Sequence, residues 1–185
     1  MACPHVADVA ALLKKKHPDW MPAIIRSAMM TTANIVDNND DGVDDGSAVT
    51  PLMAGVGMVL SRIAMRPGMV NDTGTQQYVE FICTLNYTTK RMRHRTRICT
   101  LTRTMTKVSE QPSETYEVSV MALEGVKITV MPAMLAFKQQ REKMSYIVEC
   151  FSDVVKPAGA WDLCSISWMS IDHKATRPIS FTWGK

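Results

Sequence analysis

The sequence has 185 residues, of which 46% are hydrophobic and 21% are charged, and its formal net charge is +3. This composition is typical of a globular protein and excludes an intrinsically disordered chain. The charge is too small to favour nucleic-acid binding, and no apolar stretch is long enough to cross a membrane. A basic segment at residues 90–103 holds six lysine and arginine residues and no acidic one. We interpret it as a solvated face in preference to a polyanion site, and we expect neither nucleic acid nor membrane as a partner.

Helical spacing dominates the first third of the chain. Apolar residues at i, i+3, i+4 and i+7 predict a helix over residues 2–16, and Pro18 ends it. A second helix is predicted over residues 22–32, with a proline at its start and Met21 at the N-cap position, where Ser or Thr would cap better. A third apolar stripe predicts a helix over residues 75–85. The stripe of the first helix consists of Val6, Val9, Ala10 and Leu13.

After about residue 101 the apolar period changes to two. Alternating runs predict strands at residues 115–120, 126–130 and 144–150, and again around residues 166–168 and 179–183. Turn residues separate these runs, as at Gln111-Pro112 and Glu124-Gly125. Several short alternating strands at this spacing are typical of a β-sandwich. The predicted fold class is therefore α+β, with a helical part over residues 1–100 and a β-sandwich over residues 101–185.

Neither the cysteines nor the acidic residues form a complete metal-site pattern. The five cysteines form no Cys-x-x-Cys pair, so a zinc site has no support. Residues 37–42 match the first half of an EF-hand loop, but Ala48 stands where a bidentate glutamate is needed. We interpret this segment as an acidic surface loop and predict no metal site and no cofactor.

Several segments together resemble the plant-type subtilisin-like serine proteases, the subtilase family. The first residues resemble the end of the subtilase serine motif, and residues 77–87 resemble a stretch peculiar to the plant members. Residues 125–132 and 177–183 are similar to the C-terminal fibronectin type III-like domain of that group. The match runs in order along nearly the whole chain. The serine-motif residues are Met1, Ala2, Cys3, Pro4 and His5.

The resemblance implies a more specific architecture. Residues 1–100 would be the helical C-terminal remnant of a subtilisin-like α/β domain, and residues 101–185 a fibronectin type III-like β-sandwich. The family's opening strand is missing between Cys99 and Thr102, so the sandwich would lack its first strand and leave a sheet edge exposed. Because two short helices cannot cover each other's apolar faces, we expect residues 1–60 to be molten, aggregated or docked on a partner that supplies the missing surface.

The resemblance also implies that the catalytic groups are absent. The family's catalytic serine comes immediately before the position of Met1, and its catalytic Asp, catalytic His and oxyanion-hole Asn lie further upstream. Subtilase chemistry requires all four groups, so we expect this chain, a C-terminal fragment of such a protease, to be inactive. His5 is a packing residue of the motif and not its general base.

The other candidate nucleophiles lack a motif that would position a base beside them. His17, His94 or His173 would need a positioned Ser and Asp to form another triad, and the sequence has no nucleophile-elbow motif. Cys3 lies at a helix N-terminus, where the pKa of a thiol falls, but no positioned base is evident.

The resemblance and two sequons suggest covalent features that need an oxidising, secretory environment. Cys83 and Cys99 resemble a family pair able to form a disulfide, and Asn71 and Asn86 begin Asn-x-Thr glycosylation sequons. The family is secreted, whereas the N-terminus here shows no signal-peptide pattern, so the sequence leaves the localisation open.

Two functions follow from the sequence. The first is a truncated subtilisin-like serine endopeptidase whose family activity, protein hydrolysis through an acyl-enzyme, is lost. The alternative is a non-catalytic β-sandwich interaction module, or a partner of another subtilase, which binds a second chain through the exposed sheet edge.

Overall fold

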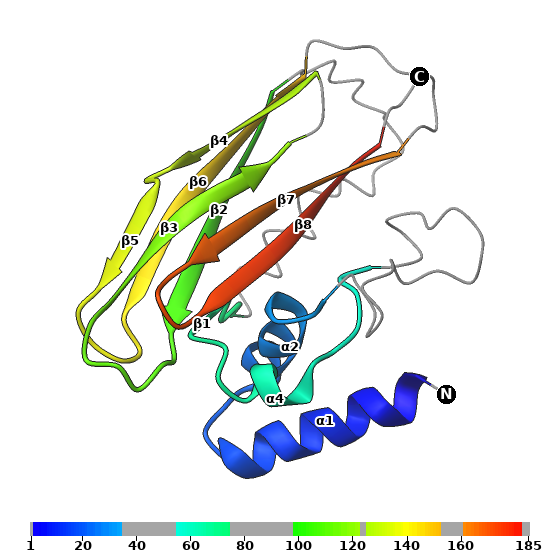
Figure 1. Cartoon of the computed structure of the whole chain (residues 1–185), viewed down its shortest axis with the longest axis vertical. Coiled ribbons are helices and arrows are strands. Elements are labelled where there is room, and N and C mark those ends of the chain that lie inside the picture. Colours follow the sequence, from blue (N-terminus) through cyan, green and yellow to red (C-terminus); the bar gives the residue numbers. More distant parts are fainter. Residues whose placement is uncertain (1, 35–54, 75–97, 123–124, 153–160, 183–185) are drawn as a thin grey trace.

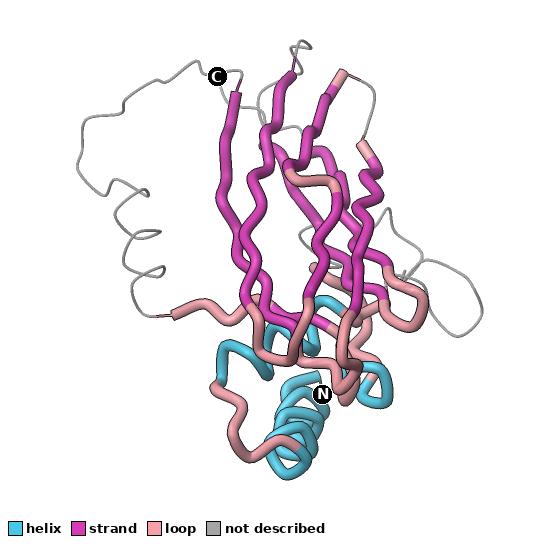
Figure 2. The backbone as a smooth tube through the Cα atoms, turned by 90° about the vertical axis from the view of Figure 1, so that its left-hand side faces the viewer, coloured by secondary structure: helices cyan, strands magenta, loops and turns pink. Residues whose placement is uncertain are grey.

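The structure is a computed structural model, and it describes residues 2–34, 55–74, 98–122, 125–152 and 161–182. Within these ranges the fold consists of two antiparallel sheets and a group of short helices. The helices gather at one end of the sheets, with α1 farther from them than α2 (Figure 1, Figure 2). The predicted acidic loop, the predicted helix over residues 75–85 and most of the basic segment lie outside the described residues.

Both of the described helix predictions are confirmed. The first helix is α1 (Ala2–Lys16) and the second is α2 (Pro22–Thr31), and a short helix, α4 (Ser61–Ala64), follows. Met21 has extended backbone angles at the N-cap of α2 and makes no side-chain capping bond there. The start of α2 therefore depends on Pro22, whose ring presets a helical φ.

The β-sandwich has four strands in each sheet within the described ranges. One sheet has the order β1-β2-β6-β4 and the other has the order β5-β3-β7-β8. Each predicted alternating run falls within a strand, apart from Trp183, which lies outside the described residues. The strands of the first sheet are β1 (Met69–Val70), β2 (Ile98–Lys107), β6 (Lys143–Ser152) and β4 (Val126–Met131). Those of the second sheet are β5 (Met134–Phe137), β3 (Glu114–Met121), β7 (Trp161–Met169) and β8 (Lys174–Thr182).

The core of the sandwich consists of the inward-facing residues of both sheets. Trp168 and Tyr116 from one sheet have no exposed surface, and Tyr146 from the other is 2% exposed. The rings of Tyr146 and Trp168 meet edge to face with centroids 5.1 Å apart, a favourable geometry for aromatic pairs. Alternation along the strands therefore buries one face of each sheet against the other, as the sequence predicts.

The outer side of β2 is only partly covered. β2 pairs with β6 over almost its whole length, but on its other side β1 pairs only with Thr106 and Lys107. Among the described residues, no other strand pairs with the outer side of residues 98–105. The first strand of the sandwich is thus β1, which has two residues and belongs to the helical half of the chain. The ten-residue β2 follows it.

The helical half has a core of its own. Leu13 of α1 and Ala28 of α2 are fully buried, and Trp20 of the connection between the two helices is 6% exposed. Ala64 of α4 and Val70 of β1 complete this cluster. The sequence prediction for residues 1–60 did not foresee this core, in which α4 and β1 help to cover α2 and the end of α1. The start of α1 lacks such cover among the described residues, since Val6 is 42% exposed.

Gly68 joins the two halves of the molecule. Its carbonyl accepts hydrogen bonds from the backbone N–H groups of Val108 (2.8 Å) and Ser109 (2.9 Å), just after β2. Its φ is +72°, and an added Cβ would lie 2.5 Å from the hydroxyl of Tyr116 and 2.6 Å from Cβ of His173. Both the backbone angle and the lack of space therefore require glycine at this position.

Candidate functional site

The serine-motif residues do not form a site in the described structure. Met1 lies outside the described residues, and Ala2, Cys3, Pro4 and His5 are all exposed on the first turn of α1. Cys3 is a free thiol. No hydrogen bond or ion pair joins Cys3 or His5 to another described residue, and the packing role of His5 stays a prediction.

Of the three histidines considered for another triad, His17 and His173 make structural contacts. His17 stacks on Trp20 with ring centroids 3.9 Å apart, and its Nε2 lies 3.2 Å from the carbonyl oxygen of Met65. His17 therefore holds the connection between α1 and α2 against the residue that follows α4. His94 lies outside the described residues, whereas His173 belongs to a buried polar cluster.

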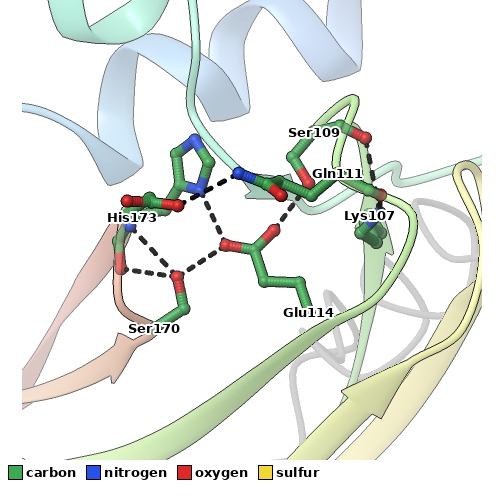
Figure 3. Close-up of polar contacts among 7 residues, drawn as sticks. Lys107, Ser109, Gln111, Glu114, Ser170 and His173 are labelled. Atoms are coloured by element: carbon green, nitrogen blue, oxygen red, sulfur yellow. Dashed lines mark hydrogen bonds and ion pairs between the residues drawn. The ribbon is translucent and has the colours of Figure 1, made fainter.

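This polar cluster centres on the carboxylate of Glu114 at the start of β3 (Figure 3). Ser109 donates its hydroxyl to Oε2 at 2.5 Å, and Ser170 donates its hydroxyl to Oε1 at 2.5 Å. Nδ1 of His173 lies 2.7 Å from Oε1, which requires the proton to be on Nδ1 because a carboxylate only accepts. The side chain of Glu114 is 8% exposed, so these three donors replace water around it.

The pKa of Glu114 shows how strongly the cluster favours its charge. Burial acts to raise this pKa, but the hydrogen bonds from Ser109, Ser170 and His173 oppose it and bring the pKa below its ordinary value. Glu114 is therefore a carboxylate at neutral pH and ties the segment after β2 to the turn between β7 and β8.

The Glu114 cluster resembles a catalytic triad in composition but not in connectivity. In a triad the acid orients Nδ1 of the histidine and the serine hydroxyl bonds to Nε2. Here both serines donate to the carboxylate, and no hydroxyl among the described residues bonds to Nε2 of His173. The cluster is a structural junction, because it contains no activated nucleophile.

Lys107 lies next to this junction and is also buried, with no exposed surface. Its ammonium group donates to the backbone carbonyl of Gln111 and lies 3.5 Å from that of Ser109. Carbonyl oxygens thus solvate the charge and close the loop between β2 and β3 (Figure 3).

A cavity of about 530 Å³ lies between α2 and strands of both sheets. Ser27 of α2, Arg103 of β2 and Arg177 of β8 line it, together with Tyr146 and Ile166 from the inner strands. This volume is in the range of small-molecule sites. The sequence interpretation missed this cavity, although one signal was present: each arginine falls at an inward position of an alternating strand.

The remaining predicted residues are only partly described. Asn71 is half-buried and lines the same cavity, and its role as a glycosylation acceptor stays a prediction. Asn86, Cys83 and the side chain of Cys99 lie outside the described residues, so the suggested disulfide is not tested. Within the described ranges, no group of metal-ligating side chains clusters and no helix has the length and apolarity to span a bilayer.

Comparison with protein families covers both halves of the chain. Residues 1–57 match the model of the subtilase family, and residues 84–181 match a fibronectin type-III domain model. The second match includes β2 to β8, apart from the last residue of β8.

Individual relatives extend the match along almost the whole chain. Subtilisin-like protease SBT1.7 of Arabidopsis thaliana is 37% identical over 99% of this chain and 28% of its own length. Subtilisin-like protease SBT3 of Solanum lycopersicum is 35% identical over 97% of this chain and 28% of its own length. The chain thus spans somewhat over a quarter of the length of these relatives.

A solved structure of a FixG-related protein from Vibrio parahaemolyticus aligns with 46% of this chain and 78% of its own. Its identity is 14% and the TM-score is 0.38, which is too low to support an argument. The family of this chain is assigned from the family models and the plant relatives instead. The chain therefore belongs to the plant-type subtilisin-like serine proteases, the subtilase family, and its C-terminal half matches a fibronectin type-III domain.

Proposed function

We propose that this chain is the non-catalytic C-terminal part of a subtilisin-like serine endopeptidase. The observation that carries the proposal is α1, which begins with the residues that follow the catalytic serine in the family motif. In the family reaction the serine attacks the peptide carbonyl, and the N-terminus of the following helix favours the developing negative charge. The chain supplies this helix, while the serine, its base and the oxyanion donor would come from sequence upstream of the motif.

The exposed start of α1 supports the same proposal. Val6 of the apolar stripe is 42% exposed, although a helix of a globular domain normally buries this stripe. Each large aliphatic side chain left in water forgoes about 1.5–3 kcal/mol. We infer that residues 1–100 are the remnant of a peptidase domain whose sheet would cover this face, and that β1 only partly replaces the sandwich's missing first strand.

The first test is covalent labelling of the 185-residue chain with a fluorophosphonate, which reacts with activated serines. We expect no labelling, because the serines of the Glu114 cluster donate to a carboxylate and have no base. An active subtilisin treated in parallel is the control for the probe. Stoichiometric labelling of any serine would contradict the proposal.

A second candidate function is a binding module that pairs another chain with the outer side of β2. Lys107 donates its N–H to Glu142 on the β6 side, whereas Val108 donates to Gly68 on the β1 side. Because donors alternate along a strand, the N–H groups of Thr102 and Thr104 point away from β6, toward the side where residues 98–105 have no described strand. An edge of this kind is a template for strand addition.

Thr102→Pro tests the edge, because proline removes an outward N–H without removing a bond to β6. We expect the chain to dimerise with rising concentration in sedimentation velocity, and the proline variant to raise the dimer dissociation constant about tenfold or more. Thr102→Val keeps the N–H group and is the matched control. Monomeric wild-type chain at all concentrations, or equal dimerisation of the two variants, would exclude strand addition by a second copy.

A further inference from the structure

Two arginines lie at positions that the alternation of their strands directs inward. In β2, Arg103 is in phase with buried Met105 and half-buried Leu101, and it pairs with buried Tyr146 of β6. In β8, Arg177 lies between buried Ala175 and half-buried Ile179, and it pairs with buried Ile166 of β7. Inward positions of a sandwich are normally apolar, because a charge there loses its hydration. A pair of cations at such positions needs a physical explanation.

Both guanidinium groups line the cavity beneath α2, which is largely apolar. Aliphatic side chains from both sheets form much of its wall, and Ser27, Thr176 and Asn71 add polar groups. None of its described lining residues is an aspartate or a glutamate, and a third arginine, Arg26 of α2, also lines it. The aliphatic members from the strands are Leu101, Val148, Ile166 and Ile179.

The charge of Arg177 is poorly compensated by the described protein. Its Nε is buried without a hydrogen-bond partner, and its Nη2 lies 3.5 Å from the hydroxyl of Ser27, at the limit of a hydrogen bond. Burial lowers the pKa of Arg177, and the nearby charge of Arg103 lowers it further against the opposing effect of Tyr146. Arg103 donates to the carbonyl of Thr102 at 3.0 Å, and neither arginine forms an ion pair with a described carboxylate.

An anion between the two guanidinium groups would resolve this imbalance. Two like charges near each other are destabilising, whereas a carboxylate accepts hydrogen bonds from guanidinium groups in a geometry that fits their planar fork. A free phosphate would leave the aliphatic wall without a partner, but a carboxylate with a hydrocarbon body would cover it. The lining therefore favours an amphipathic ligand over an inorganic ion.

We propose that this cavity binds an apolar monocarboxylate, with the carboxylate held by Arg103 and Arg177 and the hydrocarbon chain against the aliphatic wall. None of the described serine-motif residues lines the cavity, so this proposal does not rest on the proposed protease function. It would couple ligand binding to the contact between α2 and the sandwich, because residues of both elements line it.

Isothermal titration calorimetry of the 185-residue chain with octanoate tests this site. We expect saturable binding of octanoate, and an affinity at least about tenfold lower in Arg177→Gln and in Arg103→Gln, since each removes one charge-assisted contact. Lys127→Gln is the control, because it removes one exposed cation of β4 that does not line the cavity. It should change the affinity by less than about twofold.

Two further ligands separate the contribution of the carboxylate to the affinity from that of the hydrocarbon chain. Octanamide has the same hydrocarbon chain without the charge and should bind at least about tenfold more weakly than octanoate. Inorganic phosphate has charge without hydrocarbon and should not displace octanoate at equal concentration. If Arg177→Gln fails to fold, as judged by circular dichroism, Arg103→Gln decides the result.

The proposal is overturned by any of four outcomes: no octanoate binding, equal binding of octanamide, displacement by equimolar phosphate, or wild-type affinity in the folded arginine variants. Equal binding of octanamide would show a purely apolar cavity, and displacement by phosphate would show a simple anion site. Selective loss of octanoate binding in the arginine variants, with Lys127→Gln unchanged, would support it.

Discussion

Trp168→Ala is expected to destabilise the sandwich by about 3–5 kcal/mol, the usual cost of deleting a large aromatic side chain from a core. Trp168 has no exposed surface and contacts the ring of Tyr146 from the opposite sheet edge to face. Removing the indole would leave a cavity between the sheets that the paired strands cannot close. Since a domain is stable by only about 5–15 kcal/mol, this loss would remove a large part of the free energy of unfolding.

Urea denaturation followed by circular dichroism measures this effect. Ile171→Ala is the control, because Ile171 lies in the turn after β7 with its surface fully exposed, and its removal should change the free energy of unfolding by less than about 0.5 kcal/mol. Trp168→Phe keeps an aromatic ring and removes an indole N–H that has no partner, so its loss should be smaller than that of alanine. Equal stability of Trp168→Ala and the wild type would show that the two sheets do not share this core.

Glu114→Gln is expected to destabilise the protein by about 2–4 kcal/mol at pH 7, because it breaks a buried, fully hydrogen-bonded carboxylate cluster. The amide of glutamine can accept at only one of its two ends, whereas Glu114 accepts from Ser109 at one oxygen and from Ser170 and His173 at the other. At least one of these buried donors would lose its acceptor. The junction between the segment after β2 and the turn before β8 would loosen.

The free energy of unfolding measured against pH is a second test of the role of Glu114. Burial acts to raise the pKa of Glu114, but the hydrogen bonds of the cluster hold it below the ordinary value of 4.5. Its contribution is therefore complete above about pH 4.5 and is lost as the pH falls through the lower pKa of the folded state. Urea unfolding at a series of pH values should show the gap between wild type and Glu114→Gln narrowing on the acid side.

Glu117→Gln is the control for this series, since Glu117 lies on the same strand and is exposed. It should leave the stability and its acid slope within about 0.5 kcal/mol of the wild type. A constant gap between wild type and Glu114→Gln from neutral to acid pH would mean that the charge of Glu114 contributes nothing to the folded state.

The type and position of α1, α2 and most strands could be predicted from the sequence, because they follow from local periodicity, whereas the four-residue α4 was not predicted. Residues three or four apart share a helix face, and alternate residues share a sheet face, whatever the rest of the chain does. Val130, Tyr146 and Trp168 could thus be placed in a β core from spacing alone. The strand β1 could not, since Met69 and Val70 form a strand only because β2 lies beside them.

The contacts between distant residues were decided by the tertiary structure alone. Glu114 and His173 are 59 residues apart in sequence, and no local pattern predicts which histidine meets which carboxylate. The same holds for Arg103 and Arg177, whose inward phase was visible in the sequence but whose shared cavity required both sheets and α2. Periodicity assigns a side chain to a face, whereas the packing of one face on another selects its partners, and that packing depends on loop closures and side-chain volumes that no local pattern contains.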